Sequence, residues 1–173
     1  MSVLEKFKSI KTFVFDVDGV MTDGSVQVYE TGEQVRRMST RDGYSLQLAI
    51  RKGYRILVIS GALSEGVRQR LHYLGIKDIF LDIHDKVAVL RQYAKDHGLD
   101  AEDMLYMGDD MPDYLPMQFV GLACAPADAA PEIRHIAAYI SSFNGGQGCV
   151  RDVIEKVLKL NGHWDLNTTV VSK

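Results

Sequence analysis

Cysteine, stretches of positive charge and long apolar runs are all scarce in this chain. Only two of its 173 residues are cysteines, Cys124 and Cys149, and neither has the CxxC or Cys/His spacing of a metal or redox site. Lysine and arginine total 20 against 23 aspartates and glutamates, which gives a formal charge of -3. Nucleic-acid binders usually carry a basic excess, so we expect no nucleic-acid partner.

The longest apolar segments are too short for a membrane protein. None approaches the roughly 20 residues that cross a bilayer, and the run at Phe13–Phe15 is too short for a signal peptide. We therefore expect a cytoplasmic protein with no membrane partner. A hydrophobic fraction of 46% with 25% charged residues is typical of a soluble globular chain, and the length predicts one domain over residues 1–173.

Short apolar runs alternate with helical patterns along the chain, which indicates a parallel sheet flanked by helices. The expected strands, all apolar enough to be interior, are Thr12–Asp16, Arg55–Ser60, Asp78–Leu81, Met104–Met107 and Phe119–Leu122. Apolar residues at helical spacing predict helices around 67–74, 87–94 and 150–158. The predicted fold class is α/β, a doubly wound Rossmann-like parallel sheet with helices on both faces.

One segment, Ser25–Met38, interrupts this alternation. Its two short apolar runs, Val26–Tyr29 and Val35–Met38, flank a Glu30–Glu33 turn and predict a β-hairpin. A plain doubly wound fold has a short loop at this place, so we interpret the hairpin as an insertion after the first strand. The tail over residues 162–173 has no periodicity, and we expect it to be mobile in isolation.

Acidic residues follow two of the expected strands. Asp16 and Asp18 come after the first strand in an Asp-Val-Asp-Gly sequence, and a later strand leads into Asp109, Asp110 and Asp113. Because the carboxyl ends of parallel strands meet at one edge of a sheet, we expect these carboxylates to lie together. Their repulsion calls for a hard cation, and oxygen ligands without His or Cys favour Mg²⁺. Individually, Asp16 could cap a turn, and Asp110 and Asp113 could serve a helix N-terminus.

A hydroxyl and a lysine stand at two further strand ends. The strand that ends in Ser60-Gly61 leads into a helix, where a hydroxyl and N–H groups can bind an anion. Lys86 opens the next helix, where a cation opposes the helix dipole, so we expect it to pair with the acidic cluster or with a phosphate. A simple cap for Ser60 and a solvated side chain for Lys86 remain as alternatives.

The order of these motifs, DxDG, Ser-Gly, Lys and GDDxxD, resembles the haloacid dehalogenase superfamily of phosphohydrolases. The resemblance implies that Asp16 is a nucleophile that forms an aspartyl phosphate, and that Asp18 is the general acid and base. A carboxylate that approaches an anionic phosphate needs charge neutralisation, which Mg²⁺ and Lys86 would supply.

The same resemblance implies which residues bind the metal and the phosphoryl group. Mg²⁺ would be held by Asp16, the backbone carbonyl of Asp18 and Asp109, with support from Asp110 and Asp113. The phosphoryl oxygens would be held by Ser60, Gly61 and Lys86.

A narrower resemblance concerns the small capless members of that superfamily that act on sugar-acid phosphates. It is carried by residues 16–24 with the hairpin, by Thr40–Gly43 and by Gly145–Arg151. It implies a substrate such as 3-deoxy-D-manno-octulosonate 8-phosphate, or alternatively an N-acylneuraminate or KDN 9-phosphate. The residues implied for the sugar pocket are Arg41, Asp42, Gly43 and Arg70. Many octulosonate phosphatases have Thr-Gly-Arg where this chain has Ser60-Gly61-Ala62, which leaves the choice of sugar open.

The resemblance also implies a homotetramer in which hairpins join centrally and each neighbour completes a site. The main alternative from another class is a receiver-like signalling domain, which also gathers strand-end acids and a lysine around Mg²⁺. In a receiver the lysine would stand on the final strand, whereas here the second acidic cluster follows Lys86. A noncatalytic module on the same fold would not require both Asp16 and Asp18.

Overall fold

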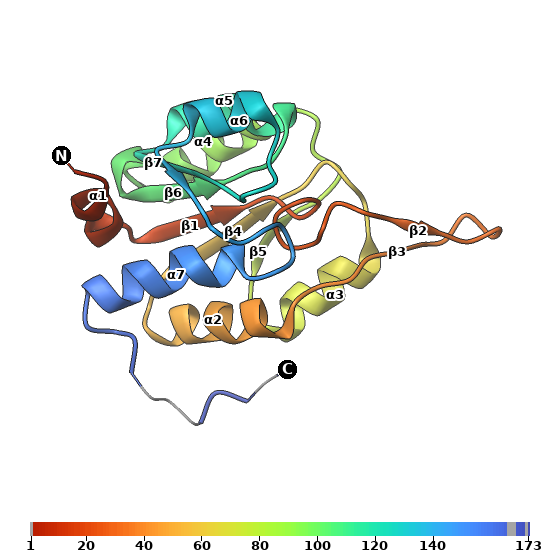
Figure 1. Ribbon diagram of the computed structural model, residues 1–173, viewed down its shortest axis with the longest axis horizontal. Coiled ribbons are helices and arrows are strands. Elements are labelled where there is room, and N and C mark those ends of the chain that lie inside the picture. The colour runs from red at the N-terminus through yellow and green to blue at the C-terminus, as the bar shows by residue number, and fades with distance from the viewer. Residues whose placement is uncertain (1, 166–168, 172) are drawn as a thin grey trace.

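The computed structural model describes residues 2–165, 169–171 and 173 (Figure 1). The elements in chain order are α1 (Val3–Ser9), β1 (Thr12–Phe15), β2 (Gln27–Val28), β3 (Gln34–Val35), α2 (Thr40–Arg51), β4 (Arg55–Ile59), α3 (Glu65–Tyr73), β5 (Asp78–Phe80), α4 (Lys86–Asp96), η1 (Ala101–Asp103), β6 (Met104–Met107), η2 (Met111–Asp113), α5 (Tyr114–Phe119), β7 (Leu122–Ala125), α6 (Pro131–Ile136), β8 (Tyr139–Ile140) and α7 (Cys149–Leu160). None of the described helices is long and apolar enough to cross a membrane.

Six strands form one parallel sheet in the order β5-β4-β1-β6-β7-β8. β1 lies inside the sheet, where Phe13 stands opposite Ile56 of β4 and Leu105 of β6. The chain first extends the sheet from β1 to β4 and β5, and later adds β6, β7 and β8 on the other side of β1. Loops that leave the carboxyl ends of β1, β4 and β6 therefore converge at one switch point. The predicted doubly wound α/β fold is confirmed.

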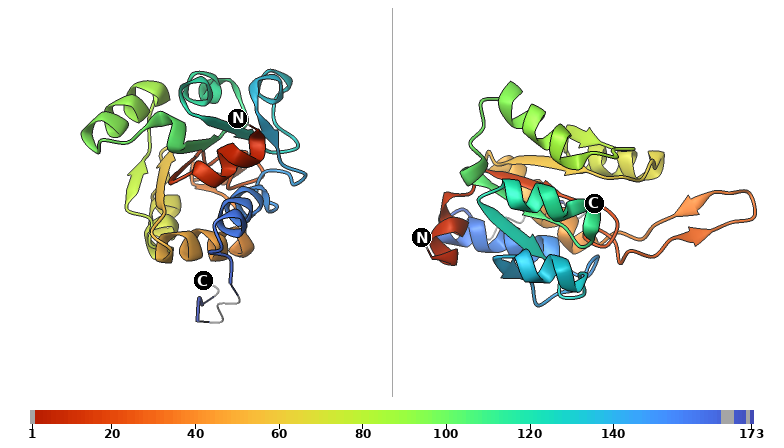
Figure 2. Two further views of the ribbon diagram at one scale, coloured as in Figure 1. Left: turned by 90° about the vertical axis from the view of Figure 1, so that its left-hand side faces the viewer. Right: turned by 90° about the horizontal axis from the view of Figure 1, so that it is seen from above.

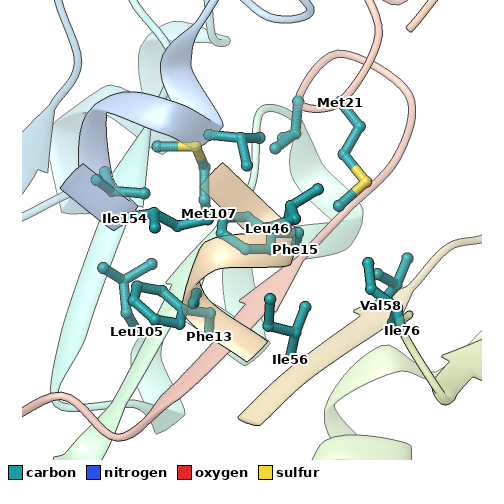
Figure 3. Close-up of a cluster of buried hydrophobic side chains, with 14 of the residues drawn as sticks. Phe13, Phe15, Met21, Leu46, Ile56, Val58, Ile76, Leu105, Met107 and Ile154 are labelled. Atoms are coloured by element: carbon teal, nitrogen blue, oxygen red, sulfur yellow. The ribbon is translucent and has the colours of Figure 1, made fainter. Parts of the chain in front are cut away.

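Helices cover both faces of the sheet, and each face has its own core (Figure 2). Side chains alternate along β1, so that Phe13 and Phe15 pack with α2 and α7 while Val14 packs with α4 and α5. Figure 3 shows part of the first cluster, in which Leu46 and Ile154 lie over the strand residues. Burial of side chains this size stabilises the fold by roughly 1.5–3 kcal/mol each.

The sequence prediction was wrong about the limits of one strand and the place of another. The strand expected over Phe119–Leu122 runs over Leu122–Ala125, because Phe119 is the last residue of α5 and the apolar run continues from that helix into β7. β5 was expected in the interior, but it is an edge strand whose residues are half-buried. Two further elements, α1 and β8, were not predicted from the sequence.

The predicted hairpin is present, with shorter strands than expected. Val28 stands opposite Gln34, and the two-residue strands form a separate antiparallel sheet that projects from the body of the molecule (Figure 2). Val28 is 65% exposed and Val35 is 42% exposed, so the hairpin buries little of its own apolar surface.

The tail expected over residues 162–173 lies partly outside the described residues, since 166–168 and 172 are not described. Its described end contacts the helices beside it. The Gln47 side-chain amide donates to the Val171 carbonyl at 3.2 Å, and the Arg70 guanidinium donates to the Lys173 carbonyl at 2.8 Å. Val170 is buried against the core cluster that includes α2.

Candidate active site

A pocket of about 400 Å³ opens where the loops after β1, β4 and β6 converge. The predicted site residues that line it are Asp16, Asp18, Ser60, Gly61, Lys86, Asp109, Asp110 and Asp113. Residues separated by almost a hundred positions thus meet because parallel strands end at the same edge. The arrangement concentrates acidic groups around a single buried ammonium.

Lys86 is this ammonium, and its side chain is only 3% exposed. Its Nζ lies 2.8 Å from Asp16 Oδ1 and 2.8 Å from Asp113 Oδ1. Burial lowers the pKa of Lys86, but attraction to the carboxylates of Asp16 and Asp113 raises it by more. The pKa of Lys86 is therefore above its ordinary value. These ion pairs explain why a lysine occupies the first residue of α4, where the helix dipole disfavours it.

The acidic residues carry more negative charge than Lys86 neutralises. Carboxylate oxygens of Asp16, Asp109 and Asp113 all lie within 4.8 Å of one another. Burial, followed by repulsion from Asp113, raises the pKa of Asp16, and the same two causes raise that of Asp109 to about 7. Carboxylates this crowded fit a hard divalent cation, and their oxygen donors are those that Mg²⁺ prefers.

Two glycines allow the acidic groups to approach one another. Gly19 has a φ of +83°, and a Cβ built there would lie 1.9 Å from Asp109 Oδ2. A Cβ on Gly108 would lie 2.3 Å from the Asp113 Cβ. Any side chain at either position would displace a carboxylate, which accounts physically for the glycines of the DxDG and GDD motifs.

Asp113 is held in place by Tyr106, a residue that the sequence argument missed. The Tyr106 hydroxyl donates to Asp113 Oδ1 at 2.7 Å, and the Asp109 backbone N–H donates to Asp113 Oδ2 at 3.1 Å. Tyr106 is fully buried in β6, where a hydroxyl needs a partner. A tyrosine within an otherwise apolar strand that ends in an acidic motif was the available signal.

Asp18 stands apart from the acidic cluster. Its side chain is 32% exposed, and its two oxygens accept hydrogen bonds from Arg36 of the hairpin at 2.7 and 3.2 Å. The Thr22 hydroxyl lies 3.5 Å from Asp18 Oδ1. Asp18 therefore faces the mouth of the pocket, while Asp16 faces the cluster. Nothing in the local sequence around Arg36 predicts this contact.

Ser60 lies in a loop and not at a helix N-terminus, which corrects the sequence argument. The N-cap of α3 is Ser64, whose hydroxyl accepts from the Val67 N–H at 3.3 Å. Ser60 is buried at the end of β4, and its hydroxyl accepts from the Ala62 N–H at 3.2 Å. Ser60 and Gly61 both line the pocket, from a loop that precedes α3 by several residues.

The four residues implied for the sugar pocket lie outside the acidic pocket of the described chain. Arg70 lines a hollow of about 830 Å³ between the hairpin and α3, and Arg41 lines another of about 440 Å³ beside α7. Asp42 is buried and accepts the Arg151 N–H at 2.9 Å, so it caps α7. Burial raises the pKa of Asp42 to about 6. Gly43 faces Arg70, since a Cβ there would lie 3.1 Å from Arg70 Nη2.

The fold and the pocket together define a hydrolase with a doubly wound sheet, a strand-end carboxylate pair and an oxygen-only cluster suited to a divalent cation. The chain belongs to the haloacid dehalogenase-like hydrolases, whose family model matches residues 74–154. It is therefore an enzyme, and the resemblance expected from the motifs is confirmed.

Three similar proteins carry a more specific name. The 3-deoxy-D-manno-octulosonate 8-phosphate phosphatase of Escherichia coli K12 is 31% identical over 163 residues, which cover 94% of this chain and 87% of that protein. The crystal structure of the Yersinia pestis phosphatase of the same name has a TM-score of 0.91 at 30% identity and covers 93% of this chain and 87% of that chain. The Moraxella catarrhalis phosphatase, in complex with magnesium, phosphate and KDO, has a TM-score of 0.88 at 32% identity, with 91% of each chain covered.

Proposed function

We propose that the protein is a Mg²⁺-dependent phosphatase that hydrolyses 3-deoxy-D-manno-octulosonate 8-phosphate through an aspartyl phosphate on Asp16. The observation that carries the proposal is one pocket lined by Asp16, Asp18 and Lys86, in which Asp16, Asp109 and Asp113 form an oxygen-only acidic cluster. The likeness to octulosonate phosphatases extends over 94% of the chain, and one such relative holds magnesium, phosphate and KDO.

In the first half-reaction, the carboxylate of Asp16 attacks phosphorus while the bond from phosphorus to the sugar oxygen breaks. Asp18 gives its proton to that oxygen, so the sugar acid leaves as an alcohol. Lys86, 2.8 Å from Asp16, and the hydroxyl of Ser60 balance and orient the phosphoryl oxygens. In the second half-reaction Asp18 removes a proton from water, which attacks phosphorus and releases phosphate and the free Asp16.

We assign the metal to Asp16 and Asp109, with the backbone carbonyl of Asp18 and support from Asp110. Mg²⁺ supplies charge neutralisation and orientation of the phosphoryl group when it is bound. Asp113 already accepts from Lys86, Tyr106 and the Asp109 N–H, so its role is to hold these groups in position.

The choice among sugar acids depends on the rim of the pocket. Ala62 stands where many octulosonate phosphatases have arginine, and it lines the pocket. The difference in sequence therefore lies at the site itself. The 9-phosphates of N-acylneuraminate and KDN are the alternative substrates to be measured beside octulosonate 8-phosphate. The exposed Arg41 and the half-buried Arg70 favour a substrate with a carboxylate over a simple hexose phosphate.

We further propose that the protein is a homotetramer whose hairpins meet and whose neighbours complete each pocket. A two-stranded hairpin is marginally stable in water unless it packs against something, and the exposed Val28, Tyr29 and Val35 need such a surface. Closed symmetry is the usual form of such assemblies.

A phosphate-release assay tests the function. The substrates are octulosonate 8-phosphate, N-acetylneuraminate 9-phosphate and glucose 6-phosphate, each with Mg²⁺ and with EDTA. We expect release from octulosonate 8-phosphate that EDTA abolishes and Mg²⁺ restores. Equal rates on glucose 6-phosphate would contradict the sugar-acid assignment, and recovery with Zn²⁺ but not Mg²⁺ would contradict the metal.

A further inference from the structure

Arg36 is the first residue after β3, and its side chain turns inward while its neighbours point to solvent. The Arg36 side chain is 5% exposed in the ion pair with Asp18, whereas Val35 and Arg37 on either side are exposed. Arg36 Nε donates to Asp18 Oδ1 at 2.7 Å and Nη2 donates to Oδ2 at 3.2 Å, so the guanidinium binds both carboxylate oxygens. Such paired contacts fix the plane of a carboxylate.

Asp18 has little else to fix its orientation. Within the described part of the chain, its carboxylate also contacts the Thr22 hydroxyl at 3.5 Å, which is at the limit of a hydrogen bond. Its carboxylate is not a member of the cluster formed by Asp16, Asp109 and Asp113. A partly exposed aspartate with one weak contact would adopt several rotamers without Arg36.

Arg36 also joins two hollows that lie side by side. It lines the large hollow between the hairpin and α3, while Asp18 lines the acidic pocket. The hairpin strands β2 and β3 lie between Asp18 and Arg36 in the sequence, so the ion pair closes the base of the hairpin. Figure 1 shows the hairpin projecting from the body of the molecule. The position of the hairpin and the direction of the Asp18 carboxyl are therefore mechanically linked.

We propose that Arg36 is a positioning residue that aims Asp18 at the oxygen of the leaving group. The inference rests on the proposed function of Asp18 as proton donor. The proton passes from Asp18 to the sugar oxygen, and Arg36 keeps its own protons throughout. If the ion pair only anchors the hairpin, its loss should lower the rate on every substrate alike. If it aims Asp18, its loss should lower the rate only on substrates whose leaving oxygen needs a proton.

The test compares two leaving groups in Arg36→Gln, Arg36→Lys and the matched control Arg37→Gln. Octulosonate 8-phosphate releases an alkoxide that must be protonated, whereas p-nitrophenyl phosphate releases a stable phenolate. Because general acid catalysis contributes about 100-fold or more, we expect Arg36→Gln to lower kcat on the sugar phosphate by about 10- to 100-fold, and on p-nitrophenyl phosphate by less than about 3-fold. Arg36→Lys should be intermediate, and Arg37→Gln should match the parent.

A double variant provides the second readout. In an Asp18→Asn background, Arg36→Gln should cause no further loss on the sugar phosphate, because the group that it aims is gone. Equal losses on both leaving groups, or additive losses with Asp18→Asn, would overturn the inference while the phosphatase function stands. If the parent cleaves p-nitrophenyl phosphate but not octulosonate 8-phosphate, the proposed substrate fails, and the comparison is made with an alkyl phosphate that the parent accepts.

Discussion

Asp16 is buried, Asp109 is half-buried, and both lie close to a third carboxylate, Asp113; burial with repulsion raises the pKa of both. Near neutral pH, Asp109, with a pKa of about 7, is protonated in a substantial fraction of metal-free molecules. A cation held by both carboxylates, as we propose, requires them in their charged form, so its binding would release protons. The single residues thus couple metal binding to pH.

We expect the affinity for Mg²⁺ to rise between pH 6 and pH 8, with protons released on binding. Isothermal titration calorimetry in two buffers with different ionisation enthalpies measures the number released. The metal-free fold should show the opposite trend: carboxylates whose folded pKa is raised cost stability as pH rises above about 4 towards 8, because the unfolded chain holds fewer protons than the folded one. An affinity that does not change over this range would contradict the assignment of Asp109 to the metal.

Asp16→Asn is expected to abolish turnover and leave the fold intact, because the amide keeps the size of the side chain and removes the proposed nucleophile. Circular dichroism checks the fold, and phosphate release measures turnover. Asp18→Asn should lose activity severely on octulosonate 8-phosphate and much less on p-nitrophenyl phosphate. Phosphate release above background by Asp16→Asn would assign the nucleophile to another group.

Tyr106→Phe removes the hydroxyl that donates to Asp113 and keeps the ring. We expect a loss of about 0.5–1.5 kcal/mol in the free energy of unfolding, as for one buried hydrogen bond. Because Asp113 also holds Lys86 and the Asp109 N–H, the affinity for Mg²⁺ should fall as well. Tyr54→Phe is the control, since Tyr54 is a half-buried tyrosine in the core cluster remote from the acidic pocket. An unchanged Mg²⁺ affinity in Tyr106→Phe would limit this tyrosine to packing.

At the scale of elements, the strands that bear the site are the ones that the sequence predicts best. β1, β4 and β6 are continuous apolar runs that end in polar motifs, so their positions and their shared edge follow from composition and topology. The limits of β7 cannot be predicted in this way, because an apolar run continues from α5 into the strand. α1 could have been predicted from the sequence, since Ser2 and Glu5 form a capping box.

The parts of the site that sequence patterns did not predict depend on tertiary contacts. Arg36 reaches Asp18 only because the hairpin returns to the base of its own loop, and no local spacing encodes that return. The motif containing Asp42 was linked to the sugar by resemblance, whereas its carboxylate caps α7 from α2. A short polar motif does not by itself show whether a side chain binds a ligand or caps the N-terminus of a helix.

Helix α7 supplies a further prediction at this scale. Ile154 is fully buried against the sheet. Ile154→Ala should lower the free energy of unfolding by about 2–5 kcal/mol, and Ile154→Val by about 0.5–1.5 kcal/mol. Urea denaturation measures both. A loss in the alanine variant no larger than in the valine variant would show that α7 adjusts to fill the space.

At the scale of the whole molecule, the hairpin is the surface that most needs a partner. We expect the double variant Val28→Asp, Val35→Asp to lower the oligomeric state seen by light scattering, because it places charge on exposed apolar residues. Leu4→Asp is the matched control: Leu4 is 64% exposed on α1, at the opposite end of the molecule (Figure 1).

The same variant tests whether neighbours share the site. If each hairpin helps to complete a neighbouring pocket, the dissociated variant should lose activity on octulosonate 8-phosphate. A parent protein that is already monomeric, or a dissociated variant with full activity, would contradict the shared-site proposal.

The two glycines at the pocket also determine how this enzyme can change over evolutionary time. A methyl group at position 19 would occupy the place of an Asp109 oxygen, and one at position 108 would collide with Asp113, so neither position can drift without loss of the acidic arrangement. Ala62 has no such constraint, since it lines the pocket mouth and already carries a Cβ. New substrate preferences are therefore accessible through a small set of rim positions, and a mutational library aimed at altered specificity should vary residue 62 and leave residues 19 and 108 untouched.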